Sequence, residues 1–297
     1  MNLVDSATPD LIQTHAQATS TPSVTEIGPP KGWQLVNVRE LWQFRDLLYF
    51  LTWRDVKVRY KQTALGAAWA VLQPAMMMIV FTIFFAKLAK IESGDLPYPL
   101  FVYAGLLPWT FFATAITSGG NSVIGSERLI TKIYFPRLAI PFAAVGAALV
   151  DLFVAFGLLA VLMICHGAWG GWMTLMLPVL LAIMLVAAIG VGTLLAALNV
   201  NYRDFRYVIP FLAQTWMFAT PSIYLDIFGA NADPSNWFRA LLALNPMTGL
   251  VAGFRAALLG TPMPWDLVGY AAASAIAIFA AGCFYFRRLE DTFADVI

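Results

Sequence analysis

Few side chains in this sequence are of the types that carry out catalysis. Its two histidines, His15 and His166, lie far apart, the first in a polar region and the second at the end of an apolar run. Neither has neighbours in the sequence that would complete a Ser–His–Asp group or a metal site. The two cysteines, Cys165 and Cys283, lie inside apolar runs and are expected to pack as small hydrophobic residues. We therefore predict no catalytic residue, metal or cofactor in this chain.

The phosphate-binding sequence G-x-x-x-x-G-K-[ST] does not occur in the 297 residues. In ATPases of the common type, this loop and its lysine hold the phosphates of the nucleotide. The chain is therefore predicted not to hydrolyse ATP. Energy from ATP would have to come from a partner protein.

Asp151 is the one acidic residue in the middle of a long apolar segment. Proton- or sodium-coupled carriers usually place several ionisable groups at this depth. A single carboxylate is better explained by a position inside a helix bundle, paired with a hydroxyl group, although membership of a relay stays open. Ion coupling is therefore not supported by the sequence.

Composition places these residues in a membrane. Hydrophobic residues make up 60% of the chain and charged residues 12%, whereas soluble domains have about 25% charged residues. A seventh apolar stretch, Trp237–Gly260, is interrupted at Asn245-Pro246 and Gly249, which predicts two short re-entrant half-helices. We predict an all-α, polytopic membrane protein with six spans, each long enough for a hydrocarbon core of about 30 Å. The predicted spans are Ala64–Ala86, Tyr98–Ser118, Leu138–Cys165, Trp172–Leu198, Tyr207–Leu225 and Asp266–Phe286.

Two segments precede the spans. Residues 1–32 are rich in Pro, Thr, Ser and Gln and are predicted to be a disordered cytosolic tail. Residues 33–61 are predicted to contain an amphipathic helix lying on the bilayer, with a helix packed on another domain as the alternative. Its predicted polar face holds Arg39, Gln43, Asp46, Arg54, Lys57 and Lys61, and its apolar face Leu41, Phe44, Leu47, Leu48, Leu51 and Val58. Residues 62–297 would form the six-span membrane domain.

The basic residues predict the orientation. With six spans, fourteen of the eighteen Lys and Arg residues fall on the side of the two termini. The positive-inside rule then places both termini in the cytoplasm. The two halves of the chain show no repeat of the kind found in many secondary carriers. A wide pathway would therefore need a second copy of the chain, most simply related by two-fold symmetry.

Two loops on the predicted cytoplasmic side are unusual. Asn121–Pro141 carries Leu129, Ile130, Ile133, Tyr134 and Phe135, and Asn199–Pro210 carries aromatic residues among charged ones. Exposed hydrophobic residues in such numbers indicate short helices offered to a cytosolic partner. The alternative is positive-inside charge combined with interfacial aromatic anchors.

Several segments, in this order and spacing, carry a family resemblance. They are LLYFLTWRDVKVRYKQTALGAAWAVLQP (Leu47–Pro74), YAGLLPWTFF (Tyr103–Phe112), LITKIYFPRLAIP (Leu129–Pro141), NVNYRDFRYVIP (Asn199–Pro210), ATPSIY (Ala219–Tyr224), NPMTGLVAGFR (Asn245–Arg255) and FRRLEDTFADVI (Phe286–Ile297). Together the segments resemble the permease subunits of type-2 ABC exporters, which move polysaccharides, O-antigens or teichoic-acid-like polymers attached to a lipid. The resemblance extends from Leu41 to Ile297.

The resemblance implies a homodimer bound to two separate ATPase subunits, which would hold the ATP and Mg. It also implies a main coupling helix around Glu127–Tyr134, a second contact at Tyr202–Phe205, and outer gate helices around Asn245–Arg255. The implied ATPase-coupling residues are Glu127, Arg128, Leu129, Lys132, Tyr134, Tyr202, Arg203, Asp204 and Phe205. The implied outer-gate residues are Asn245, Pro246 and Arg255.

Sugar rings stack on aromatic side chains, so a polymer conduit can be lined by aromatic residues. The candidates are Trp69, Phe81 and Phe84 on the first span and Phe211, Trp216, Phe218 and Tyr224 on the fifth. Packing or contact with lipid explains any one of them equally well. Near the bilayer surface, Arg54, Lys57, Arg59 and Lys61 are candidates for binding the diphosphate of a lipid carrier, with general attraction to anionic lipids as the alternative.

The resulting prediction is a permease subunit for export of a lipid-linked polysaccharide across the bacterial inner membrane. Its partners would be a second copy, the ATPase subunits, the lipid-linked polymer and membrane lipids. The net charge of +1 gives no indication of nucleic acid binding. One alternative is a type-2 exporter of small hydrophobic drugs or lipids. Another is a membrane glycosyl- or phosphotransferase, for which Glu290, Asp291 and Asp295 are the nearest acidic cluster.

Overall fold

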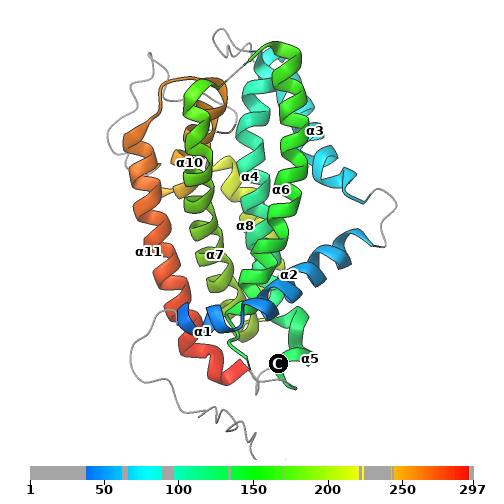
Figure 1. Ribbon diagram of the computed structural model, residues 1–297, viewed down its shortest axis with the longest axis vertical. Coiled ribbons are helices and arrows are strands. Elements are labelled where there is room, and N and C mark those ends of the chain that lie inside the picture. The colour runs from blue at the N-terminus through cyan, green and yellow to red at the C-terminus, as the bar shows by residue number, and fades with distance from the viewer. Residues whose placement is uncertain are drawn as a thin grey trace, which may run out of the picture. The chain divides into compact units, whose positions relative to one another are not determined.

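The computed structural model describes residues 38–61, 66–88, 97–132, 135–168, 170–220, 223, 242 and 244–293. Within these ranges every regular element is a helix (Figure 1). The α-helices are α1 (Val38–Gln43), α2 (Arg45–Tyr60), α3 (Ala68–Phe81), α4 (Tyr98–Ser122), α5 (Glu127–Ile130), α6 (Ala139–His166), α7 (Leu177–Asn201), α8 (Phe205–Phe218), α10 (Pro246–Leu259) and α11 (Trp265–Leu289). The other helices are the π-helix η1 (Thr82–Leu88) and the 3-10 helices η2 (Ile124–Ser126), η3 (Gly171–Met176) and η5 (Glu290–Thr292). The predicted tail, 1–32, lies outside the described residues.

Among the described residues, five helices are long and apolar enough to cross a membrane, which confirms the predicted all-α polytopic fold. They are Ala68–Phe85, Tyr98–Ser122, Ala139–His166, Gly171–Asn201 and Trp265–Leu289. The predicted fifth span, Tyr207–Leu225, is represented by α8, whose 14 residues extend about 21 Å. Most of 221–241 lies outside the described residues, so the sixth crossing stays a prediction.

Helix α4 lies at the centre of the bundle, in contact with α3, α6, α7, α8 and α10. In Figure 1, α4, α6, α7 and α11 run along the vertical axis, and α2 crosses near their lower ends. Of the most apolar 18 residues of α4, 78% are buried, compared with 6% in Ala68–Phe85, which begins with α3. Helix α3 therefore lies on the periphery and presents most of its side chains outward.

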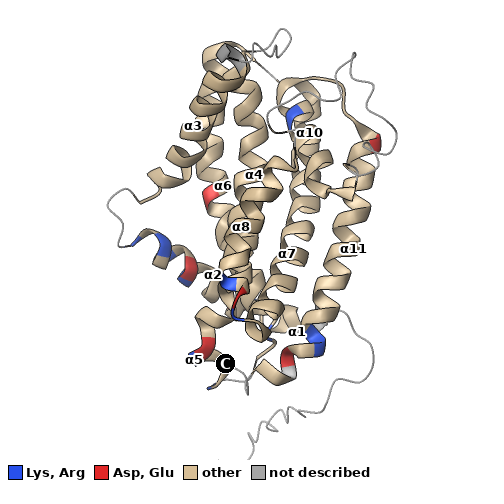
Figure 2. Cartoon of the chain, turned by 180° about the vertical axis from the view of Figure 1, so that it is seen from behind, with Lys and Arg blue, Asp and Glu red and all other residues tan. Residues whose placement is uncertain are grey.

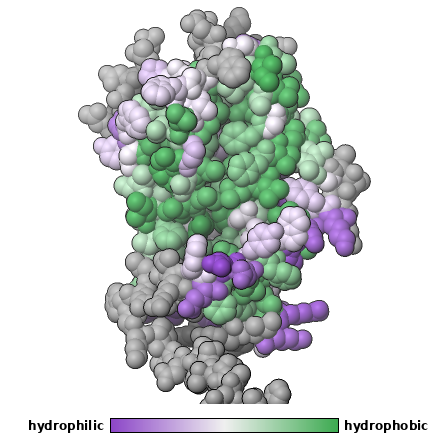
Figure 3. All heavy atoms as spheres, in the orientation of Figure 1, coloured by the Kyte–Doolittle hydropathy of each residue, from purple (hydrophilic) through white to green (hydrophobic). Residues whose placement is uncertain are grey.

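Helix α2 packs against α6. Leu51 is 1% exposed, and Leu47 and Leu48 pack in the same cluster. Val58, on the predicted apolar face, is 74% exposed, whereas Val56 beside it is buried. Arg59 and Tyr60, at the same end of α2, contact Asp151 of α6. Figure 3, in the orientation of Figure 1, shows hydrophobic side chains over the middle of the bundle and hydrophilic ones gathered around α2 and below it.

Helix α10 is the described part of the predicted re-entrant segment. It begins after Asn245, with Pro246 in its first turn, and ends at Gly260, whose φ is 72°. This positive φ and the position of Gly260 at the end of α10 are typical of a glycine that terminates a helix in the left-handed conformation. The predicted interruption at Gly249 is wrong, since Gly249 lies inside α10. Its missing Cβ instead allows close approach to the backbone of Leu267 in α11.

Candidate functional site

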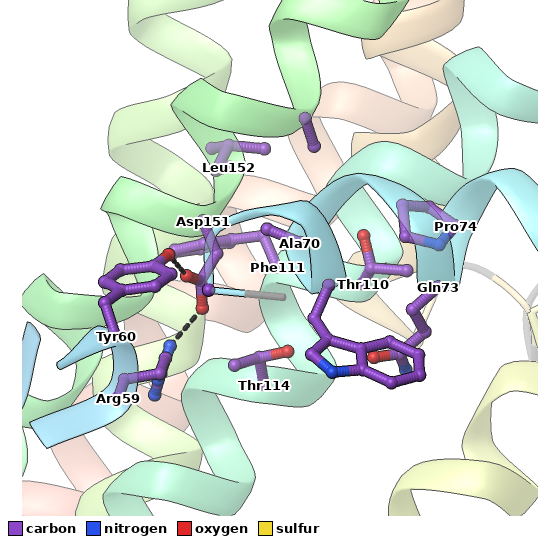
Figure 4. A pocket seen from close by; sticks show the side chains of 13 residues that line it. Arg59, Tyr60, Ala70, Gln73, Pro74, Thr110, Phe111, Thr114, Asp151 and Leu152 are labelled. Carbon is purple, nitrogen blue, oxygen red and sulfur yellow. Dashed lines mark hydrogen bonds and ion pairs between the residues drawn. The ribbon is translucent and has the colours of Figure 1, made fainter. Parts of the chain in front are cut away.

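A pocket of about 380 Å³ lies between the end of α2, the start of α3, and the middle of α4 and α6 (Figure 4). We call it the Asp151 pocket. Its lining includes Arg59, Tyr60, Trp69, Gln73, Thr110, Phe111, Thr114, Asp151 and Leu152. A second pocket of about 330 Å³, the α8 pocket, lies between α3, α4 and α8. Both pockets are lined by Gln73, Thr110 and Thr114, so together they form one groove along α4.

Asp151 is held by two residues from the end of α2. Arg59 forms an ion pair with Asp151 Oδ2, and the Tyr60 hydroxyl donates to Asp151 Oδ1 (Figure 4). The Arg59 Nη2 also donates to Ser118 Oγ of α4, over 3.0 Å. The Arg59 and Asp151 side chains are 29% and 18% exposed. The predicted hydroxyl partner of Asp151 is thereby confirmed, but sequence reasoning missed its arginine partner, which lies 92 residues earlier.

The Tyr60 hydroxyl is a donor over the whole physiological range. Burial raises its pKa, and the hydrogen bond to Asp151 raises the pKa further. A hydroxyl that keeps its proton can donate to the carboxylate while Arg59 supplies the opposite charge. Within the described ranges, no group of three His, Cys, Asp or Glu side chains could hold a metal ion.

A stripe of hydroxyl groups on α4 faces this groove. Thr110 and Thr114 line both pockets, and Thr117 and Ser118 line the α8 pocket. Spacings of four, seven and eight residues place side chains on one face of a helix. Sequence analysis missed the stripe, although its period within an apolar span was the signal that could have revealed it. Gln214 of α8 adds an amide on the opposite wall.

The predicted conduit aromatics do not form one lining. Trp69 lines the Asp151 pocket and is 55% exposed. Phe81 instead packs edge-on against Phe85, with ring centroids 5.7 Å apart. Trp216 packs against Phe112 of α4 at 5.2 Å. The remaining three described candidates, Phe84, Phe211 and Phe218, are exposed but line neither pocket. Tyr224 lies outside the described residues.

The four basic residues predicted to bind a lipid carrier are also separated. Arg54 contacts Asp55 at 2.9 Å and donates to Ser126 Oγ at 3.4 Å. The Lys57 ammonium lies 5.4 Å from the centre of the Trp53 ring. Arg59 points into the Asp151 pocket, while Lys57 and Lys61 are exposed. Only these two lysines therefore present their charge outward at this end of α2.

The first predicted coupling segment is α5 with η2 before it. Glu127, Arg128 and Lys132 are exposed beside Arg54, around a pocket of about 560 Å³. Ile130, however, is 6% exposed and packs in a cluster with residues of α2, α6, α7 and α11. Phe135 packs in that cluster too, so the prediction that these two hydrophobic residues face a partner is wrong. Leu129 is half-buried against the same cluster, and Tyr134 lies outside the described residues.

The second predicted coupling segment joins α7 to α8. Tyr202, Arg203 and Asp204 are exposed, and the Tyr202 and Phe205 rings lie 6.2 Å apart. Buried Asn199 connects this loop to the first one, since its Nδ2 donates to the Gly120 carbonyl at 2.9 Å and to Asn121 Oδ1 at 3.1 Å. The two segments therefore lie at the same end of the bundle, next to one another.

Helix α10 lies at the opposite end of the bundle from α5 (Figure 2). There the predicted outer-gate residues brace it. Asn245 Oδ1 accepts from the Met247 N–H and from Trp216 Nε1, each at 3.0 Å, and its Nδ2 donates to Thr220 Oγ1 at 2.8 Å. Arg255 is 8% exposed and donates to the carbonyls of Phe101 at 3.3 Å and Ile223 at 3.0 Å. Its guanidinium also lies 3.6 Å from the centre of the Phe101 ring. Pro246 occupies the first turn of α10.

We expect Asn245→Ala to loosen the attachment of α10 to α8. The variant loses a helix cap and three further side-chain hydrogen bonds, and leaves the Trp216 N–H without its acceptor. A cost of about 1–3 kcal/mol is expected. Thermal unfolding of the purified protein in detergent would measure it. Thr292→Ala, which removes an exposed hydroxyl bonded within its own turn, is the control, and equal melting temperatures for both variants would contradict the bracing role.

Comparison with known proteins agrees with this arrangement. Residues 46–259 match the family model described as ABC-2 type transporter. The O-antigen export system permease protein RfbA of Myxococcus xanthus is 33% identical over 263 residues, which are 88% of this chain and 98% of that protein. A protein of the same name from Klebsiella pneumoniae is 23% identical over 85% of this chain and 95% of its own length. The polysialic acid transport protein KpsM of Escherichia coli is 22% identical over 69% of this chain and 78% of its own length. This chain is therefore a multi-pass membrane protein that belongs to the ABC-2 type transporter family.

Proposed function

We propose that this chain is the permease subunit of an ATP-driven exporter that carries a lipid-linked polysaccharide across the bacterial inner membrane. The observation that carries the proposal is the likeness, over most of its length, to permeases named for O-antigen export. The polar groove along α4 supports it independently. The chain would supply the path, and two ATPase subunits would supply ATP, Mg and the energy of transport.

The chemistry of the groove favours a saccharide over a small hydrophobic drug. Sites for apolar molecules are lined mainly by hydrophobic and aromatic side chains with few polar groups. This groove also has apolar and aromatic side chains, but among them it presents Thr110, Thr114 and Thr117 on one wall, and Gln73 and Gln214 on others. Hydroxyls and amides can exchange hydrogen bonds with successive sugars without holding any one of them strongly.

The acidic residues that would suit a membrane transferase have a simpler explanation. Glu290 lies 3.6 Å from Arg287, one turn earlier at the end of α11. An ion pair of this kind stabilises a helix end. Asp295 lies outside the described residues.

A homodimer fits the exposed faces of α3 and α8. Helix α3 has little of its surface buried, and both helices carry large exposed hydrophobic residues, among them Met76, Ile79, Tyr207 and Phe211. A second copy placed against these faces would close the groove into a path between the two protomers. The conduit aromatics Phe84, Phe211 and Phe218 would then lie near the interface between the two protomers rather than in the lipid.

Charge supports cytoplasmic termini. Lys and Arg gather near the end of the bundle that holds α1, α2 and α5, and Arg287 and Arg288 lie at the same end in α11 (Figure 2). By the positive-inside rule this end faces the cytoplasm. The segments α5 and Tyr202–Phe205 would then contact the ATPases, and α10 would lie at the outer gate. The exposed Lys57 and Lys61 would attract the diphosphate of the carrier.

A complementation experiment tests the proposal. Cells that lack this chain should lose surface polysaccharide and accumulate it on the cytoplasmic side, and the wild-type chain should restore export. We expect Arg128→Glu to insert normally but to reduce both co-purification of the ATPase and surface polysaccharide by at least about tenfold, because a reversed charge at an interface is repelled by its former partner.

Asp266→Arg serves as the matched control. It reverses a charge in the exposed first turn of α11, at the opposite end of the bundle. It should retain the ATPase and export. Surface polysaccharide that persists in the deletion strain would contradict the proposed function, and an ATPase that stays bound to the Arg128→Glu chain would contradict the coupling role of α5.

A further inference from the structure

We infer that the Asp151 pocket binds a pyranose ring of the exported glycan and excludes the diphosphate of its carrier. The inference rests on the proposed function and assigns to this pocket one part of the substrate. Arg59, grouped by sequence with the carrier-binding residues, would instead belong to a saccharide site.

The charged groups of the pocket favour a neutral ligand over an anion. Arg59 is the cation of the lining and Asp151 its anion, and the two are joined in an ion pair. A diphosphate entering the pocket would gain Arg59 but would also approach the Asp151 carboxylate. Repulsion of like charges in a partly buried site costs free energy, so the pair makes the pocket unfavourable for an anion. A neutral ligand meets no such penalty.

The side chains that line the pocket suit the surface of a sugar ring. A sugar ring offers an apolar face of C–H groups and a rim of hydroxyls. Trp69 provides an exposed indole at one side of the pocket, suited to stacking. Gln73, Thr110 and Thr114 provide both donors and acceptors around it (Figure 4). The ionised pair adds one strong acceptor and one strong donor for neighbouring hydroxyls.

The pocket lies between the last turn of α2 and the α8 pocket. Its walls include the last turn of α2, and Lys57 and the adjacent Lys61 present their ammonium groups outside the pocket. A headgroup at these lysines would place the first sugars of the glycan beside the pocket opening. Its volume of about 380 Å³ lies within the range of small-ligand sites. From there, the shared Gln73, Thr110 and Thr114 lead directly into the α8 pocket.

Binding can be measured without transport. The full chain is placed in lipid nanodiscs, and the probe is a short oligosaccharide released by mild acid from the host's own surface polysaccharide. Saturation-transfer NMR should show binding to the wild-type chain. Trp69→Leu and Gln73→Leu should each weaken it by about tenfold, the contribution of one stacked ring or one group of hydrogen bonds. Trp172→Leu, which removes an exposed tryptophan from η3, should bind as the wild type does.

Inorganic diphosphate is the second probe. It should not displace the oligosaccharide from the wild-type chain. In Asp151→Asn, where the arginine charge is no longer balanced, it should compete, while saccharide binding falls by about tenfold. Displacement of the saccharide by diphosphate in the wild type, or unchanged binding in both Trp69→Leu and Gln73→Leu, would overturn the inference. Neither result would affect the complementation test, so the proposed function could stand if this inference fails.

Discussion

Replacing Gly282 by valine is expected to prevent α7 and α11 from packing and to remove most of the protein from the membrane fraction. A Cβ at Gly282 would overlap the Gly190 carbonyl oxygen and lie 2.9 Å from Thr193 Oγ1. The two helices are equally close at Gly190 of α7, where a Cβ would lie 2.6 Å from the Phe279 Cα of α11. Small residues of this kind let helices in membranes approach closely enough for their backbones to touch.

The effect should be large because the obstacle is backbone. A flexible side chain could move aside, but a helix carbonyl cannot move without shifting the whole helix. Overpacking typically costs about 1–3 kcal/mol and can cost more where nothing can yield. Valine adds two further methyl groups beyond the Cβ, which places Gly282→Val at or above the upper end of that range.

A matched variant lies on the same helix. Gly269 in α11 has open space where a Cβ would lie. Gly269→Val changes the same residue type in the same helix and should leave the amount of protein nearly unchanged. Size-exclusion chromatography of fluorescently tagged protein and the melting temperature in detergent would compare the two. Similar melting temperatures would show that the close contact of α7 and α11 contributes little to stability.

The second large effect is expected from breaking the pair of Arg59 and Asp151. Asp151→Leu leaves the Arg59 guanidinium partly buried without its anion and deprives the Tyr60 hydroxyl of its acceptor. Removing one partner of a buried pair costs about 3–5 kcal/mol. Because these side chains retain some exposure, a smaller loss of about 1–3 kcal/mol is expected here. Surface polysaccharide should fall below a tenth of the wild-type amount.

The double variant Arg59→Met with Asp151→Leu separates stability from function. Replacing both members of a pair with apolar residues of similar size is often neutral or stabilising. We therefore expect the melting temperature to recover while export stays low, because the pocket has lost both of its charged groups. Asp266→Asn, at an exposed position in the first turn of α11, controls for loss of a carboxylate. Recovery of full export in the double variant would show that the pair acts only by holding α2 against α6.

The hydrophobic pattern was sufficient to predict the fold class and the main helices. Long apolar segments are local features, and a chain in lipid must satisfy its backbone hydrogen bonds within each segment, so their lengths predict spanning helices directly. The predicted Leu138–Cys165 and observed Ala139–His166 differ by one residue at each end. The predicted interruption at Asn245-Pro246 is also observed, because the start of a helix depends on neighbouring residues.

Residues in contact across long sequence separations were not predictable. Arg59 was grouped with Arg54 and Lys57 because the three share a charged helix, yet tertiary packing directs Arg59 to Asp151 and Arg54 to Ser126. Ile130 and Phe135 were taken as exposed because they lie in a polar loop. They are buried because the first half of α2 and the ends of α7 and α11 meet at that loop.

The sequence by itself determined that this protein is built of membrane helices and lacks the phosphate-binding sequence G-x-x-x-x-G-K-[ST], since both properties depend on residues close together in the chain. Only the tertiary structure decided which polar residues share a site. Thr110, Gln73 and Asp151 come from three helices, and each alone is a minor polar interruption in an apolar segment. They become one groove because α3 and α6 pack against the same length of α4, a choice made by the fit of side chains across the bundle.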